Sequence, residues 1–319
     1  MILGRRRPGE VTRPGTAVRP ARAVVRGRDR SRERWFYLLI APWLFGLIVL
    51  QVLPMLAATG LSFADWEPPL APRWVGLDNL AELGSDPRFA SAVANTIVYG
   101  LATVVPGLAI GLGLALLLGP RRRGGTVLRT TVFLPAIVAG VATALMWGWV
   151  FNPRSGLVDG VLGIVGLQGP AWLRDPGWAM PSMVVIGLWN VGVNVVVYIA
   201  ALGTVPRELH DAAALDGAGP VGRFRYVTWP ALLPVTFYLA IVNAIAASQV
   251  FTPSYVLTRG GPGDATLTTA LYTYQTAFAY GRLGYASAIA LAVFVAVLIL
   301  TAIQFRVVGR RVPYLGADS

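Results

Sequence analysis

Six apolar segments that contain no Asp, Glu, Lys or Arg constrain this chain more than any other feature of its sequence. The first segment, residues 35–64, exceeds the ~20 residues that a helix needs to cross the hydrocarbon core of a bilayer. In lipid, backbone N–H and C=O groups must be paired within the protein, and a helix pairs them within one segment. We therefore predict an all-α integral membrane protein with six transmembrane helices. They cover about residues 35–64, 90–118, 130–151, 178–203, 231–251 and 283–304, within a domain 35–311 that is flanked by tails 1–34 and 312–319.

The composition excludes several classes of protein. With 55% apolar and only 13% charged residues, and a mean hydropathy of +0.61, the chain cannot be one soluble domain with a charged surface. All 27 basic residues are arginines, and a Walker A phosphate loop needs its lysine, so the chain carries no ATP site of that type. It has no cysteine, and His210 alone cannot build a zinc site. Because no nucleophile–base pair is readable either, we predict no enzyme activity, no metal and no cofactor in this chain.

The arginines are distributed unevenly along the chain. Residues 1–34 hold eleven of them with almost no apolar periodicity, which is typical of a disordered, solvated tail. A tail of this kind can bind nucleic acid or act as a transit peptide, but neither interleaved aromatics nor an amphipathic pattern is present. We favour a cytoplasmic tail that contacts membrane lipids. Six spans would put 21 arginines on one side and 6 on the other, which places both termini in the cytoplasm.

The polar stretch 204–230, on the arginine-rich side, reads as helix, glycine turn and helix. Pro206 and Glu208 suit a first helical turn, where the N–H that proline lacks is not needed and an acid complements the helix dipole. The positions that then share one face are Leu209, Ala212 and Ala213. Gly217 ends this helix, since glycine adopts the left-handed conformation at little cost. A second short helix is predicted from apolar residues at spacing three: Val221, Phe224 and Val227.

This stretch resembles the cytoplasmic loop of the permease subunits of bacterial binding-protein-dependent ABC importers. That loop carries Glu-Ala-Ala, three residues, Gly, nine residues and Ile-x-Leu-Pro. The present chain has, at the same spacing, Asp211-Ala212-Ala213, Gly217 and Val227-Thr228-Trp229-Pro230. Three positions depart from the pattern, with aspartate for glutamate at Asp211, valine for isoleucine at Val227 and tryptophan for leucine at Trp229. The carboxylate of Asp211 is one methylene shorter and reaches less far toward an ATPase. The resemblance implies an ABC importer permease-like bundle whose coupling loop docks on an ATPase through Glu208, Leu209, Asp211, Ala212, Ala213, Leu215 and Gly217.

Two other segments are similar to the sugar-permease branch of this family. They are residues 75–80 with 86–89, before the second span, and a Thr-x-Gly-Gly-Pro pattern at residues 258–262. The resemblance implies import of a sugar or related polyol-type solute across the bacterial cytoplasmic membrane, with glycerol phosphate as an alternative solute. It also implies three partners, namely a dimer of ABC ATPase subunits that holds ATP and Mg, a second homologous permease subunit and an extracytoplasmic solute-binding protein.

The predicted spans contain neutral polar residues but no charged ones. A proton relay built on buried charges is therefore not expected, which argues against a secondary carrier. The candidate solute path consists of amides in the fourth and fifth spans: Asn190, Asn194, Asn243 and Gln249. Together with Trp147, Trp149 and Trp189 they offer the hydrogen bonds and stacking faces that suit an uncharged, hydroxyl-rich solute. Simple interhelical hydrogen bonding is the alternative role, and a six-span carrier or membrane scaffold is the alternative function.

Overall fold

The computed structural model describes residues 30–119 and 125–307. The predicted tails therefore lie largely outside the described residues. The chain divides into two units, Met1–Pro54 and Met55–Ser319.

The first unit contains the N-terminal apolar helix. Helix α1 (Arg30–Leu47) continues through a wide π-helical turn, η1 (Ile48–Val52), into the start of α2 (Leu53–Leu61). Helix α1 begins at Arg30, five residues before the predicted start of the first span at residue 35. Arginine and glutamate are good helix formers and extend the apolar helix beyond its uncharged part.

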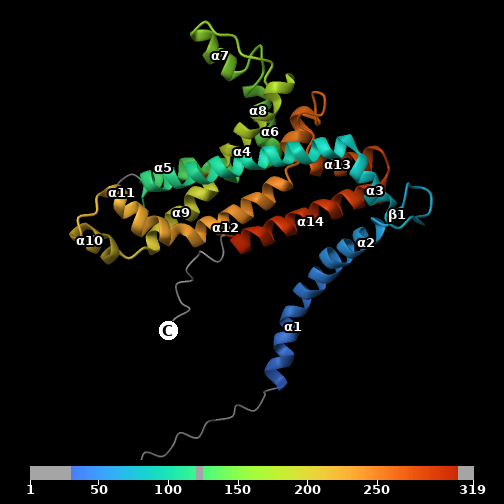
Figure 1. Ribbon diagram of the computed structural model, residues 1–319, viewed down its shortest axis with the longest axis horizontal. Coiled ribbons are helices and arrows are strands. Elements are labelled where there is room, and N and C mark those ends of the chain that lie inside the picture. Colours follow the sequence, from blue (N-terminus) through green and yellow to red (C-terminus); the bar gives the residue numbers. More distant parts are fainter. Residues whose placement is uncertain (1–29, 120–124, 308–319) are drawn as a thin grey trace, which may run out of the picture. The chain divides into compact units, whose positions relative to one another are not determined.

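The second unit is a helical bundle with one small hairpin (Figure 1). The hairpin pairs β1 (Ala64–Asp65) with β2 (Arg73–Trp74) in antiparallel fashion. The helices up to the middle of the chain are α3 (Asp78–Ser85), α4 (Pro87–Leu118), α5 (Gly125–Phe133), η2 (Leu134–Ile137), α6 (Gly140–Val150), α7 (Leu157–Ile164) and α8 (Pro176–Trp189). They are followed by α9 (Gly192–Thr204), α10 (Arg207–Leu215), α11 (Pro220–Arg223), η3 (Phe224–Thr228), α12 (Trp229–Ser248), η4 (Ser254–Thr258), α13 (Thr269–Tyr274), η5 (Gln275–Ala279) and α14 (Leu283–Val307).

Five helical runs among the described residues are long and apolar enough to cross a membrane. They are Phe36–Leu61, Pro87–Leu118, Pro176–Thr204, Pro220–Ser248 and Leu283–Val307. A sixth crossing exists if Thr126–Ile137 and Gly140–Val150, which meet at 100°, form one span. The predicted third span, residues 130–151, is therefore not one continuous helix. Val138 and Ala139 have extended backbones that interrupt it just after the tight turn η2, which holds Pro135.

Two further boundaries differ from the prediction. The second short helix of the polar stretch is not separate, since α11, η3 and α12 form one run from Pro220 to Ser248. The wide turn η3 ends two residues before Pro230, as η1 ends two residues before Pro54, and such turns absorb the hydrogen bond that a proline cannot make. The predicted fourth span is interrupted at its middle, between α8 and α9.

Helix α4 lies at the centre of the second unit, in contact with α8, α9, α12 and α13 (Figure 1). Its glycines permit a close approach to α9, where a Cβ added to Gly111 would come within 2.8 Å of the Cβ of Asn194. At the other side of α9, a Cβ on Gly192 would collide with the carbonyl oxygen of Val132. Small residues serve this purpose in membranes, where packing rather than exclusion of water drives helices together.

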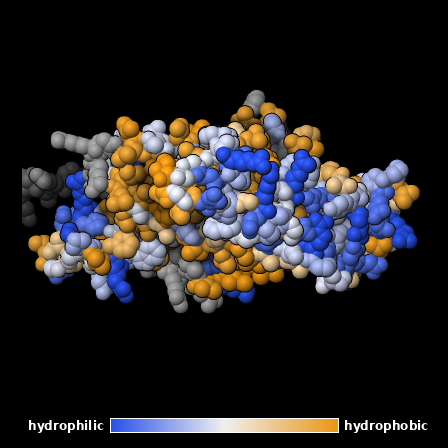
Figure 2. All heavy atoms as spheres, turned by 90° about the horizontal axis from the view of Figure 1, so that it is seen from above, coloured by the Kyte–Doolittle hydropathy of each residue, from blue (hydrophilic) through white to orange (hydrophobic). Residues whose placement is uncertain are grey.

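The surface agrees with a membrane environment. Figure 2 shows large hydrophobic areas on the visible face, and hydrophilic residues gathered toward the end where Figure 1 places β1 and α3. Exposed hydrophobic residues recur along α4 and α14, such as Leu101 at 63% and Ile299 at 55% exposure. Isolated exposed hydrophobic residues are ordinary, but continuous ones along spans of this length are typical of contact with lipid.

Candidate functional site

The predicted docking element is a short helix that ends in a glycine turn. Helix α10 begins after Pro206 and carries Glu208 in its first turn, as predicted. After the end of the helix, Gly217 has φ +81°. The N–H of Ala218 donates to the carbonyl of Ala213 at 2.9 Å, and the N–H of Gly217 donates to the carbonyl of Ala214 at 3.1 Å. This is the Schellman arrangement, in which a left-handed residue lets the chain satisfy the last helical carbonyls.

The docking helix presents its side chains openly. No residue of α10 is buried, and Leu209 and Leu215 are 52% and 90% exposed. Of the other predicted docking residues, Glu208, Asp211, Ala212 and Gly217 are exposed and Ala213 is partly buried. Figure 1 shows α10 beside α11, beyond the ends of the long helices. Exposed leucines next to a small-residue face are suited to close contact with another protein.

Three of the four predicted solute-path amides come together. Asn243 Nδ2 donates to Asn194 Oδ1 at 3.0 Å and to the carbonyl of Leu239 at 2.8 Å. The interhelical hydrogen bond is therefore present, and Asn194 is buried. Asn190, Asn194 and Asn243 also line one cavity of about 230 Å³ between α4, α8, α9 and α12. Gln249, which follows the last residue of α12, does not line this cavity, and its side chain is exposed.

Two polar cavity residues on α4 were not among the predicted ones. Tyr99 and Thr103 line the same cavity, and their spacing of four residues in an apolar span is the signal that would have identified them. The cavity also lies at the interruption of the fourth span, where Asn190 and Val191 are not helical. Irregular backbone at membrane depth is tolerated where it lines a cavity rather than facing lipid.

The predicted aromatic residues are only partly assembled. Trp147 and Trp189 meet edge to face with ring centroids 5.5 Å apart, so Trp189 joins α6 to the end of α8 beside Asn190. Trp149 does not take part in this aromatic contact and is 57% exposed.

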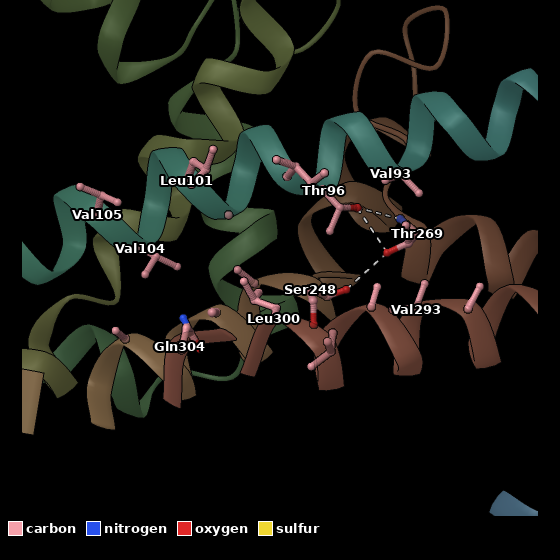
Figure 3. A pocket seen from close by; sticks show the side chains of 18 of the residues that line it. Val93, Thr96, Leu101, Val104, Val105, Ser248, Thr269, Val293, Leu300 and Gln304 are labelled. Atoms are coloured by element: carbon pink, nitrogen blue, oxygen red, sulfur yellow. Dashed lines mark hydrogen bonds between the residues drawn. The ribbon is translucent and has the colours of Figure 1, made fainter. Parts of the chain in front are cut away.

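A larger, mainly apolar cavity of about 600 Å³ lies between α4, α12 and α14 (Figure 3). Figure 3 shows Val and Leu side chains along most of it, with Gln304 toward one end. Its polar corner is tied together, because the backbone N–H of Thr269 donates to Thr96 Oγ1 at 3.0 Å and Thr269 Oγ1 donates to the carbonyl of Ser248 at 3.4 Å. No predicted solute-path residue lines this cavity.

At the start of α4, a polar network joins residues far apart in the sequence. Asp86 caps α4 by accepting from the backbone N–H of Arg88 at 2.8 Å, and its other carboxylate oxygen accepts from Tyr272 Oη at 2.5 Å and Tyr285 Oη at 2.6 Å. The Arg88 guanidinium donates to both carboxylate oxygens of Asp264 at 2.9 and 3.0 Å. This network holds α4 against the segment that leads into α14.

The network makes stability depend on pH. Burial, the largest influence, raises the pKa of Asp86, but hydrogen bonds from Tyr272, Tyr285 and two backbone N–H groups together hold it below its ordinary 3.8. Burial, together with the hydrogen bond to Asp86, raises the pKa of Tyr272 to about 12. A carboxylate with a lowered folded-state pKa stabilises the fold above its unfolded pKa, and this contribution is lost as pH falls through the folded value.

We expect Asp86→Asn to lower the free energy of unfolding by about 1 to 3 kcal/mol at neutral pH, because charged hydrogen bonds are lost. The variant should also show less destabilisation than the wild type as pH falls toward and below 3.8. Thermal unfolding in detergent across this pH range measures both effects. Asp65→Asn is the control, since Asp65 forms only an exposed pair with Arg73 at 3.6 Å. Equal pH profiles for wild type and Asp86→Asn would exclude this role.

Comparison with known proteins adds independent information. The family model described as binding-protein-dependent transport system inner membrane component matches residues 107–312. The probable ABC transporter permease protein YesP of Bacillus subtilis is 35% identical, covering 87% of this chain and 91% of its own. The sulfoquinovosyl glycerol transport system permease protein SmoG of Agrobacterium fabrum is 31% identical (90% and 98% covered). The sn-glycerol-3-phosphate transport system permease protein UgpA of Pectobacterium atrosepticum is 32% identical (91% and 100% covered).

Solved structures resemble the fold. A chain of a bacterial ABC transporter that imports the acidic polysaccharide alginate superposes with a TM-score of 0.79 at 22% identity, covering 88% of this chain and 97% of its own. A chain of a bacterial alginate ABC transporter in complex with an alginate pentasaccharide-bound periplasmic protein gives 0.80 at 20% identity, covering 89% and 97%.

Proposed function

The chain belongs to the family of binding-protein-dependent transport system inner membrane components, and we propose that it is one permease subunit of an importer powered by a separate ATPase. Members of this family are multi-pass inner membrane proteins and transporter components rather than enzymes. The observation that carries the proposal is α10, an exposed helix with the family's motif spacing and the left-handed glycine that ends it. The solute is a sugar or a related polyol-type compound.

In this proposal α10 docks in a cleft of one subunit of an ATPase dimer, which holds ATP and Mg. The contacting residues are Glu208, Leu209, Asp211, Ala212, Ala213, Leu215 and Gly217. Helix α10 follows α9 directly, so a movement of α10 on ATP binding is passed to α9 and to the cavity at its other end. A second, homologous permease and a solute-binding protein complete the importer, supported by the similar chain solved with a periplasmic protein.

We also propose six crossings with both termini and α10 in the cytoplasm, counting the bent pair of α5 and α6 as the third crossing. The support is the split of 21 to 6 arginines between the two sides. Reporter fusions after Arg225 should register as cytoplasmic, and fusions at Asp78 and Gly263 as external. A cytoplasmic signal at Asp78 is incompatible with this topology.

The cavity at the interruption of the fourth span is the proposed solute contact in this subunit. Its lining offers amides and hydroxyls and contains no charged residue, which favours an uncharged hydroxyl-rich solute. The similarity to UgpA favours glycerol phosphate as the second candidate. Neither a buried charge pair nor a coupling-ion site lines the cavity, which disfavours a secondary carrier.

The proposed solute class and the proposed contact cavity can be tested together. The experiment measures uptake of labelled sugars by cells that express this chain with its partner permease, binding protein and ATPase. Asn190→Ala should reduce uptake while ATP hydrolysis continues, because the Asn190 side chain lines the cavity and α10 is untouched. Asn194→Ala and Asn243→Ala should also reduce uptake. Each also removes the interhelical hydrogen bond, which should lower the stability of the helix bundle by about 0.6 to 2 kcal/mol. Gln249→Ala is the matched control outside the cavity. Wild-type uptake in all three cavity variants would show that these amides serve only interhelical packing and hydrogen bonding.

A further inference from the structure

A groove behind the docking helix has no role in the proposed function. It has a volume of about 510 Å³ and lies between α10, the end of α4 and the start of the run that becomes α12. Its lining consists of Leu116, His210, Pro220, Val221, Arg223, Phe224 and Thr228.

The groove contains a cation, Arg223, for which the described part of the chain provides no counter-ion. Arg223 Nε is shielded from solvent and has no hydrogen-bond partner among the described residues. The Nε of Arg129, at the same end of α4, is also shielded and unpartnered, but another nitrogen of its guanidinium, Nη2, donates to the carbonyls of Leu118 and Gly119. The Arg223 side chain is only partly exposed, and a shielded Nε–H that lacks an acceptor is unfavourable, a cost that a negatively charged ligand relieves. His210, on the facing helix, adds a second group able to donate a hydrogen bond to an anion.

The rest of the groove is apolar and lies at the end of a membrane span. Leu116 belongs to the last turn of Pro87–Leu118, and Val221, 79% exposed, and Phe224 supply further hydrocarbon surface. The ends of spans lie at the level where lipid headgroups meet acyl chains. A ligand that joins an anionic group to hydrocarbon at this level is an anionic phospholipid.

We propose that this groove binds an anionic membrane phospholipid, with its phosphate at Arg223 and His210 and the start of its acyl chains against Leu116 and Phe224. The lipid would fill the space between α10 and the spans. Its negative net charge matters, because a zwitterionic headgroup brings its own cation beside the phosphate.

Lipid titration of the purified, delipidated full-length chain, followed by native mass spectrometry, tests the proposal. Phosphatidylglycerol should bind more tightly than phosphatidylcholine of the same acyl composition. Arg223→Gln should weaken phosphatidylglycerol binding about fivefold, the amount expected for one basic residue at an anionic membrane surface. Arg223→Lys, which keeps the charge, should retain the preference. Arg225→Gln is the matched control, since Arg225 is exposed, lies two residues away on the same helical run and does not line the groove.

Three outcomes would overturn the proposal. Equal weakening by Arg223→Gln and Arg225→Gln would indicate a diffuse basic surface rather than a site. Equal binding of the two lipids by the wild type would exclude recognition of charge. Displacement of bound phosphatidylglycerol by millimolar inorganic phosphate would assign the groove to a soluble phosphate instead of a lipid.

Discussion

Replacing Gly217 by valine is expected to remove most solute import while the amount of chain in the membrane stays normal. Gly217 has φ +81°, a conformation that costs an L-residue about 1 to 2 kcal/mol and a β-branched one more. No atom lies within 4 Å of a Cβ added there, so the effect comes from the backbone alone. The turn would relax, α10 would change direction, and the ATPase would be recovered in smaller amounts on co-purification.

Gly219 is the matched control for this variant. It lies in the same loop with equally open surroundings, but its φ of −66° is ordinary for valine. Gly219→Val should therefore keep import. Asp211→Arg changes the charge of the docking surface instead of its backbone, and should weaken ATPase association by about 1 to 3 kcal/mol if the contact excludes water. Full import by Gly217→Val and Asp211→Arg at normal abundance would reduce α10 to a connector.

Replacing Gly192 by alanine is expected to destabilise the membrane bundle itself. The new Cβ would collide with the carbonyl oxygen of Val132 and come within 2.9 Å of the Cα of Phe133. Both neighbours are backbone atoms, which cannot turn away as a side chain can, so α9 and α5 must separate. Overpacking of this kind costs about 1 to 3 kcal/mol, and thermal unfolding in detergent should show a lower midpoint.

Gly203→Ala, at the other end of α9, is the control. No atom lies within 4 Å of its added Cβ, so the substitution should leave the midpoint unchanged or raise it through better helix propensity. If Gly192→Ala unfolds at the wild-type temperature, the close contact between α9 and α5 does not hold this bundle together.

The features that could be predicted from the sequence are those encoded locally. Long uncharged runs predicted the spans, and the spacing from Asp211 to Pro230 predicted the helix that ends at Gly217. A glycine after a short amphipathic helix identifies a left-handed turn without knowledge of the tertiary fold, and Gly217 confirms it.

The features that were not predicted depend on residues distant in the sequence. Asp86 meets Tyr272 and Tyr285, which lie 186 and 199 residues away, and no local pattern announces such a contact. The interruption of the fourth span at Asn190 also escaped prediction, since apolar composition is the same for a broken and a continuous helix. Gly192 reads as an ordinary glycine until α5 is placed against it.

The central claim is that ATP hydrolysis in a partner subunit drives solute through this chain. The direct test is a proteoliposome that contains the complete complex, with ATP and the solute-binding protein supplied on the same side or on opposite sides of the membrane. The account predicts accumulation of solute only when ATP is on the side of α10 and the loaded binding protein is on the other, and no hydrolysis by this chain alone. Accumulation driven by an ion gradient without ATP would contradict it.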